Sequence, residues 1–113
     1  MPHCIIVYSI NLNEEAFRTT LMREVYCATH SSGLFSSDDI KFRAIPYAYY
    51  AAQNEQQSFI HVVLKILSGR TLEQRSLLSC SVLEMLDKLT LTQVSLTVEV
   101  IEIEGDSYTK VVK

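Results

Sequence analysis

The fold of this chain is decided at residues 58–74, which read SFIHVVLKILSGRTLEQ. The first ten residues of this stretch are mostly β-branched or apolar, interrupted by one histidine and one lysine, which is typical of a covered strand. Gly69 then turns the chain, and Thr71 and Gln74 have the spacing of a capping box at the start of a helix. The stretch therefore predicts a strand that is followed directly by a helix.

The residues after this stretch predict the body of the helix and then a returning strand. The apolar positions of the helix form one stripe: Leu78, Val82, Met85, Leu86 and Leu89. Residues 94–100 alternate apolar and polar side chains with a period of two, which predicts a strand. After Val100, Ile101 and Ile103 continue the alternation in the opposite register, which predicts a β-bulge at this point.

The first part of the chain has the same plan. Residues 3–9 are apolar on both faces of a predicted strand. Asn11 and Glu14 have capping-box spacing and predict the start of a helix that ends before Gly33. The apolar residues of this helix recur every three or four positions: Ala16, Phe17, Leu21, Val25 and Ala28.

A second strand is predicted at residues 40–45, where apolar and basic side chains alternate. Lys41 and Arg43 should project from one face of this strand, while the apolar side chains face the core. Pro46 is expected to end the strand. A connector rich in Tyr, Ala and Gln, residues 46–57, joins the two parts of the chain.

Two β-α-β units therefore follow one another, at residues 1–45 and 58–104, and form a single domain over residues 1–113. Because each crossover should be right-handed, the units combine into an α+β fold, a four-stranded mixed sheet with both helices on one face. The apolar strand at residues 3–9 predicts that further copies of the chain cover the other face in a closed ring. The fold alone fixes no function.

The composition excludes several classes of protein. Hydrophobic residues make up 48% and charged residues 20%, so the chain is too apolar to be disordered and too interrupted by charge to be a membrane span. The net charge of −3, without any run of Lys or Arg, disfavours nucleic-acid partners. No charged leader precedes the first strand, which predicts a cytoplasmic protein.

The three cysteines, Cys4, Cys27 and Cys80, are far apart in the sequence. Their odd number and spacing argue against both a disulfide framework and a metal site. We expect buried, reduced thiols, since free cysteine is usually a core residue.

Pro2 is the first candidate for chemistry. Removal of Met1, which small second residues generally permit, would leave a secondary amine at the chain end. An α-amino group has a pKa of about 7.7 to 8.0, which nearby cations or burial lower toward neutrality. Pro2 can therefore serve as a general base, and the alternative is a proline that merely starts a strand.

Three cations are the second candidate feature. Lys41 and Arg43 share one strand face, and Arg70 lies at the predicted helix start, where backbone N–H groups and the helix dipole favour anions. An arginine binds a carboxylate through two parallel hydrogen bonds and stabilises an enolate as negative charge develops. Together the cations suit a carboxylate-bearing substrate, whereas each one alone would more often be a solvated surface residue.

Five segments together form a longer pattern: Pro2-His3, Gly33-Leu34-Phe35, Ile40-Lys41-Phe42-Arg43, FIHVVLKI at 59–66 and GRTLEQR at 69–75. This pattern resembles the 5-carboxymethyl-2-hydroxymuconate isomerase family of the tautomerase superfamily. The resemblance runs with almost no shift in spacing from Pro2 to about Arg75, and more loosely to about Glu104. The phrase from Leu64 to Arg75 is long enough to make chance matching improbable.

The resemblance implies a homotrimer whose terminal proline is the general base, without a metal or an organic cofactor. Carried over by position, Pro2 is the base and Arg70 binds the substrate carboxylate or its developing oxyanion. The family has arginines at both positions of the strand cations, so Arg43 is retained as a substrate-binding residue and Lys41 is a departure. Lysine cannot form the bidentate pair of hydrogen bonds that arginine forms with a carboxylate, so this departure weakens any such contact at position 41.

Other positions depart further from the family. The family carries His and Trp where this chain has Ile45 and Pro46, followed by tyrosines that we expect to shape the pocket. The exact substrate is therefore left open. His61 matches a family histidine but lies in an apolar strand, which favours a satisfied core residue over a catalyst. His3 adjoins Pro2 and is expected to orient the chain end.

The expected function is that of an isomerase in aromatic catabolism, which moves a proton in an unsaturated 2-hydroxy or 2-oxo dicarboxylate such as 5-carboxymethyl-2-hydroxymuconate. One alternative is a catalytically silent trimer of the same fold that binds small carboxylates. Another is hydration or dehalogenation of an unsaturated acid, which the superfamily also starts from a terminal proline.

Overall fold

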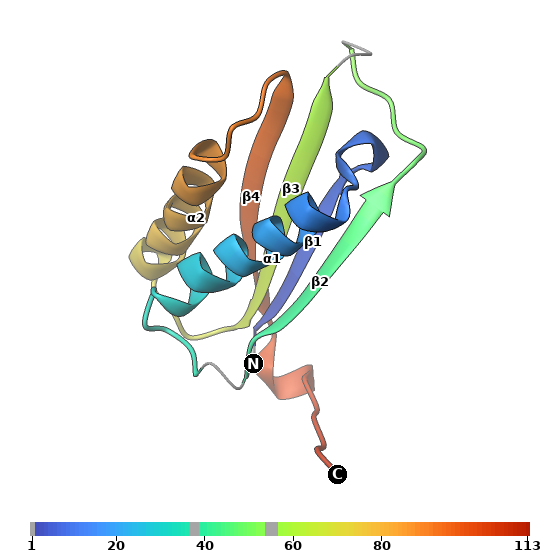
Figure 1. The fold of residues 1–113 in the computed structure, drawn as a ribbon. Helices are drawn as coiled ribbons and strands as arrows, with labels where there is room; N and C mark the ends of the chain where they lie inside the picture. The colour runs from blue at the N-terminus through green and yellow to red at the C-terminus, as the bar shows by residue number, and fades with distance from the viewer. Residues whose placement is uncertain (1, 37–38, 54–56) are drawn as a thin grey trace.

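The structure is a computed structural model and describes residues 2–36, 39–53 and 57–113. Its strands and long helices are β1 (His3–Ser9), α1 (Glu15–His30), β2 (Lys41–Tyr47), β3 (Ser58–Leu67), α2 (Leu72–Asp87) and β4 (Val94–Ile103). The sheet has the order β2-β1-β3-β4; β1 runs parallel to β2 and antiparallel to β3, and β3 runs parallel to β4. Both helices lie on one face of the sheet (Figure 1), which confirms the predicted mixed sheet with its single helix layer.

The core lies between the sheet and the two helices. Alternate residues of β1 and β3 point into it and meet one side of each helix. The fully buried members are Cys4, Ile6, Tyr8, Leu21, Val25, Ile60, Val62, Leu64, Leu78, Val82 and Leu86. The remaining strand residues form the other face of the sheet, which neither α1 nor α2 covers (Figure 1).

The predicted turn between β3 and α2 is confirmed. Gly69 has a φ of +124°, a conformation that side-chain-bearing residues rarely adopt. The Thr71 hydroxyl accepts a hydrogen bond from the Gln74 backbone N–H at 3.1 Å, and the Gln74 side chain accepts one from the Thr71 N–H at 2.9 Å. This capping box fixes the residue at which α2 begins, and it therefore also fixes the position of Arg70, which directly precedes the N-cap.

The predicted capping box at Asn11 and Glu14 is wrong. Residues 10–12 form a short 3-10 helix, and α1 begins only at Glu15, with Glu14 as an N-cap that makes no side-chain cap bond. The Asn11 side chain instead donates a 2.6 Å hydrogen bond to the Ser58 hydroxyl at the start of β3. A tertiary partner has therefore replaced the local one.

Two strand boundaries also differ from the prediction. Pro46 does not end β2 but pairs with Tyr8 inside it, which is tolerated because β2 is an edge strand where a missing N–H breaks no ladder. There is no bulge after Val100, because β4 pairs with β3 in one continuous register through Ile103. The alternation of apolar and polar residues changes here because Glu102 occupies a position on the helix side of the strand, where it forms an ion pair with Arg75 of α2 at 3.2 Å.

The cysteine prediction holds only in part. Cys4 is fully buried, and burial raises its pKa to about 12, so it is an inert thiol. Cys27 and Cys80 are exposed, because they lie on the outer sides of α1 and α2, and the prediction of buried thiols is wrong for both. Among the described residues, none of the helices is long and apolar enough to cross a membrane.

Candidate functional site

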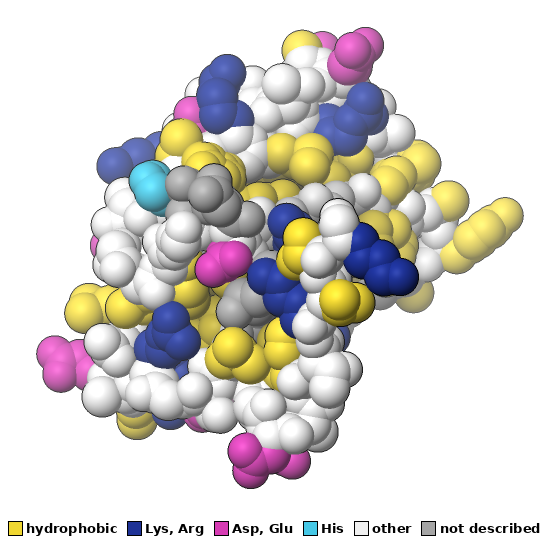
Figure 2. Space-filling model, turned by 90° about the horizontal axis from the view of Figure 1, so that it is seen from below, with side chains coloured by type: hydrophobic (Ala, Val, Ile, Leu, Met, Phe, Trp, Pro, Cys, Tyr) yellow, Lys and Arg dark blue, Asp and Glu magenta, His cyan; other side chains and the backbone are white. Residues whose placement is uncertain are grey.

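A cavity of about 550 Å³ lies at the end of the sheet where the chain begins. Three parts of the chain line it: the start of β1, the chain at and just before the start of β2, and the segment after β4. The lining residues are His3, Asp39, Lys41, Tyr108, Thr109, Lys110, Val111 and Val112. Figure 2 views the molecule from this end and shows Lys and Arg side chains gathered beside hydrophobic ones. The volume is in the usual range of small-ligand sites.

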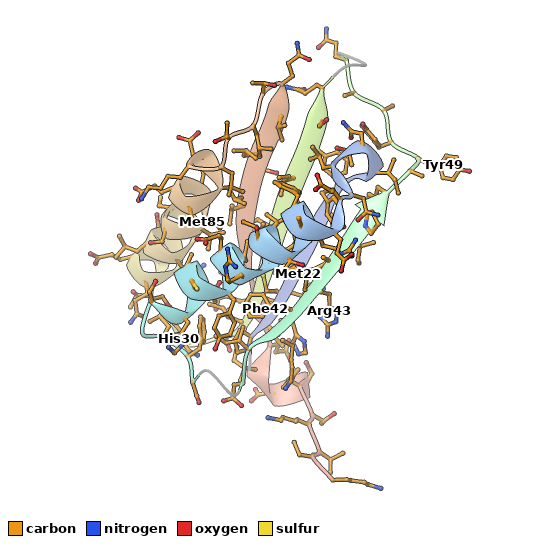
Figure 3. The ribbon with its side chains drawn as sticks, viewed as in Figure 1. Met22, His30, Phe42, Arg43, Tyr49 and Met85 are labelled. Carbon is orange, nitrogen blue, oxygen red and sulfur yellow. The ribbon has the colours of Figure 1, made fainter. Side chains whose placement is uncertain are left out.

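His3 is the centre of a hydrogen-bonded chain at this cavity. Its Nδ1 lies 3.0 Å from Arg43 Nη2, and its Nε2 lies 3.0 Å from the Tyr108 hydroxyl. A guanidinium has only donors, so Nδ1 must accept, and the neutral ring then carries its hydrogen on Nε2 and donates it to Tyr108. Figure 3 shows Arg43 leaving β2 on the side away from Phe42, which points toward α1.

The surroundings of His3 favour its neutral form. Burial lowers the pKa of His3, and the positive charges of Arg43, Lys65 and Lys41 lower it further. The unfolded chain therefore binds a proton at His3 more readily than the folded chain does. As pH falls from about 6.5 through the lowered pKa, the folded state loses the stability that the neutral histidine contributes, and at higher pH this contribution is fully present. The Arg43–His3–Tyr108 chain is therefore complete at neutral pH.

Replacement Arg43→Met should raise the pKa of His3 toward the ordinary histidine value, because it removes both a nearby cation and the donor to the neutral ring. Arg23→Met, an exposed change on α1, should leave that pKa where it is. A titration of the imidazole nitrogens followed by NMR measures both. The same His3 pKa in Arg43→Met and in the unchanged protein would contradict the assigned contact.

Three of the four predicted site residues lie at this end of the sheet. Pro2 is buried, and its carbonyl accepts a 3.1 Å hydrogen bond from the Lys41 backbone N–H. Lys41 is the register partner of His3 and lines the cavity. Arg43 reaches the cavity through its contact with His3. Lys41 and Arg43 are both exposed on one face of β2, as the alternation predicts.

Arg70 follows the end of β3, which lies beside the start of β1, but its guanidinium contacts another segment. Its Nη2 donates a 2.8 Å hydrogen bond to the Leu34 carbonyl, and its Cζ lies 5.2 Å from the centre of the Phe35 ring. Arg70 does not line the cavity next to Pro2. One of its five N–H donors is used by Leu34, so the others can still serve a ligand.

The cavity also contains residues that the sequence did not indicate. Tyr108 and Lys110 belong to the segment after Gly105, and Lys110 Nζ lies 3.6 Å from a carboxylate oxygen of Asp39. This segment has no strand or helix periodicity. The only signal that could have marked it is a single tyrosine among small and charged residues.

Two other predictions about the site need correction. The tyrosine connector starts where Tyr47 pairs with Ser9, at the opposite end of the sheet, and none of its described residues lines the cavity of the same chain. Tyr49 points away from the molecule there and is 98% exposed (Figure 3). His61 is not a core residue, because it lies on the uncovered sheet face with hydrogen bonds to Thr97 and Glu99 at 2.5 and 2.6 Å.

A second cavity of about 400 Å³ lies between α2 and the end of α1. None of its lining residues is charged: Ser32, Leu34, Gln74, Leu77, Leu78 and Ser81. A carboxylate is therefore better served by the cavity at His3. Across residues 2–36, 39–53 and 57–113, no three His, Cys, Asp or Glu side chains are grouped as a metal site would need.

A family model described as 5-carboxymethyl-2-hydroxymuconate isomerase matches residues 2–111. Among the solved structures that share the fold are the following three. One is a 5-carboxymethyl-2-hydroxymuconate delta-isomerase with 18% identity and a TM-score of 0.83, covering 100% of this chain and 89% of its own. The second is a 5-carboxymethyl-2-hydroxymuconate isomerase from Deinococcus radiodurans R1 with 21% identity and a TM-score of 0.82, covering 96% and 87%.

The third is a fused 4-OT wild type symmetric trimer with 16% identity and a TM-score of 0.74, covering 90% of this chain and 85% of its own. At these identities the similarity concerns the fold. No curated protein matches the chain.

Proposed function

Because the chain belongs to the 5-carboxymethyl-2-hydroxymuconate isomerase family, we propose that it is an isomerase that moves a proton in an unsaturated 2-hydroxy or 2-oxo dicarboxylate. The observation that carries this proposal is the cavity of about 550 Å³ at the start of β1, lined by Lys41 and Lys110 and adjoining Pro2. Such a cavity offers cations to an anionic ligand next to the residue that can supply a base.

The base is the nitrogen of Pro2 after removal of Met1. The neutral amine takes a proton from the substrate, and the electron pair left behind is delocalised onto the 2-oxygen as a dienolate. The protonated amine then returns a proton at a conjugated carbon, so no net oxidation or reduction occurs. The cations around Pro2 favour the neutral amine, which is the form that the first step needs.

Arg43, Lys41 and Arg70 supply the positive charge. Arg43 has its orientation set by His3, and Lys41 lines the cavity, so these two bind a substrate carboxylate. Arg70 does not line this cavity, so we assign to it the part of the substrate that extends beyond the lining, where the N–H donors that Leu34 leaves available stabilise the second carboxylate or the developing oxyanion. No metal or organic cofactor takes part in these steps.

The active form is proposed to be a homotrimer. The face of the sheet away from the helices carries apolar side chains such as Ile5, Val7 and Val63 between its polar groups, and apolar surface of this kind favours contact with further subunits. One structure with the same fold is a symmetric trimer. Light scattering should give three times the 12.9 kDa mass of the chain, and a monomer would contradict the assembly.

The substrate class is tested by comparing two substrates of the same chemistry. The enzyme should isomerise 5-carboxymethyl-2-hydroxymuconate with a kcat/KM about tenfold or more above that for ketonisation of phenylenolpyruvate, which has only a single carboxylate. Absorbance assays measure both rates. Equal values would contradict the dicarboxylate preference, and no turnover of either would favour the catalytically silent binding protein.

A further inference from the structure

We propose that Tyr108 is a substrate-binding residue whose hydroxyl donates a hydrogen bond to a carboxylate oxygen of the bound dicarboxylate. The ligand class in this proposal rests on the proposed function. The placement of the donor rests on the structure alone, since Tyr108 lines the cavity and its hydroxyl lies 3.0 Å from His3 Nε2.

The direction of the hydrogen-bonded chain decides what the Tyr108 hydroxyl can do. Arg43 donates to His3 Nδ1, so the neutral ring donates from Nε2 and the Tyr108 oxygen accepts. The hydroxyl hydrogen is therefore not used in this chain and can be donated to a ligand. Because the oxygen already accepts one hydrogen bond, its own hydrogen is a better donor than that of an isolated phenol.

The lining of the cavity indicates where a carboxylate would lie. Lys110 is paired with Asp39 at 3.6 Å, whereas Lys41 has no ion-pair partner among the described residues. A carboxylate between Lys41 and Tyr108 would thus meet one cation and one neutral donor. Val111 and Val112 line the same cavity and suit the carbon chain of the ligand.

The ring of Tyr108 is held independently of its hydroxyl. It packs edge-to-face on His3, with ring centroids 6.1 Å apart at an interplanar angle of 64°. Replacement Tyr108→Phe should therefore remove the donor and keep the packing. Tyr26→Phe is the matched control, because it removes a hydroxyl from a ring of α1 that packs against His30 and Phe42 and does not line the cavity.

The test is calorimetric binding of adipate, a saturated six-carbon dicarboxylate that the enzyme cannot turn over. Tyr108→Phe should weaken adipate binding about 10- to 100-fold, the cost of one hydrogen bond to a charged group, while Tyr26→Phe binds as the unchanged protein does. Thermal unfolding of the three proteins should agree within a few degrees, so that a loss of binding is not a loss of fold.

A second variant tests the part played by His3. In a His3→Phe background the hydroxyl of Tyr108 is no longer oriented, so adding Tyr108→Phe should weaken binding less than threefold further. His3→Gln keeps an acceptor for Arg43 and a donor for Tyr108, and it should restore most of the affinity. Full loss on adding Tyr108→Phe to His3→Phe would contradict the orienting role.

The outcomes separate this proposal from the proposed function. Binding that weakens in Tyr108→Phe supports the proposal whether or not the protein isomerises any substrate. Equal adipate affinity in Tyr108→Phe and the unchanged protein overturns it, as does an unchanged protein that does not bind adipate. Absence of turnover together with Tyr108-dependent binding overturns only the isomerase function.

Discussion

Turnover should fall about 10²- to 10⁴-fold when the nitrogen of Pro2 is held in an amide bond, as in a protein that carries an uncleaved extension ahead of it. An amide nitrogen has no basicity, so the proton-transfer step loses its base while the cationic cavity remains. The measurement is kcat for ketonisation of phenylenolpyruvate by the extended and the processed protein.

Variants separate loss of the base from loss of the chain end. Pro2→Ala leaves a primary amine once Met1 is removed and should retain a fraction of the activity. Pro46→Ala, a proline change in β2 at the far end of the sheet, should leave kcat unchanged. An extended protein as active as the processed one would exclude Pro2 as the base.

Arg70→Ala should lower kcat/KM about 10²- to 10³-fold, with a higher KM and a lower kcat together, because Arg70 is assigned to charge that is present in the substrate and grows in the transition state. Steady-state kinetics with 5-carboxymethyl-2-hydroxymuconate measures both constants. A fully active Arg70→Ala enzyme would refute the role.

Matched variants distinguish this role from a structural one. Arg70→Lys keeps the charge but loses the planar fork, so it should recover only part of the activity. Phe35→Leu removes the ring beside the guanidinium and keeps the substrate contacts, so it should disturb stability more than kcat. If Phe35→Leu and Arg70→Ala change the kinetics alike, Arg70 acts through the loop at Leu34 rather than on the substrate.

The fold could be predicted where local chemistry decides it. The apolar, β-branched run at residues 58–67 and the Thr71–Gln74 box act within a few residues, and the strand and the box are both present in the structure. The predictions that are wrong depend on distant partners. Asn11 bonds to Ser58, and Glu102 is neutralised by Arg75, so neither side chain follows its local pattern.

The candidate site likewise contains residues that a local pattern places and residues that only distant contacts place. Lys41 and Arg43 could be placed on one face because the strand period fixes it, and parallel pairing of β1 with β2 brings them beside Pro2 and His3. Tyr108 could not be found, because it is separated from His3 by 105 positions and lies in a segment without periodicity. The contact of Arg70 with Leu34 could not be found either, because it joins two turns that only the tertiary fold brings together.

The central claim is that the free amine of Pro2 is the base, and acylation of the untagged protein tests it most directly, because it turns that amine into an amide without basicity. Intact mass should show loss of Met1, and kcat for phenylenolpyruvate should vanish in proportion to the fraction of chains that carry an acyl group on the nitrogen of residue 2. A processed protein that stays fully active after complete acylation of that amine would contradict the account.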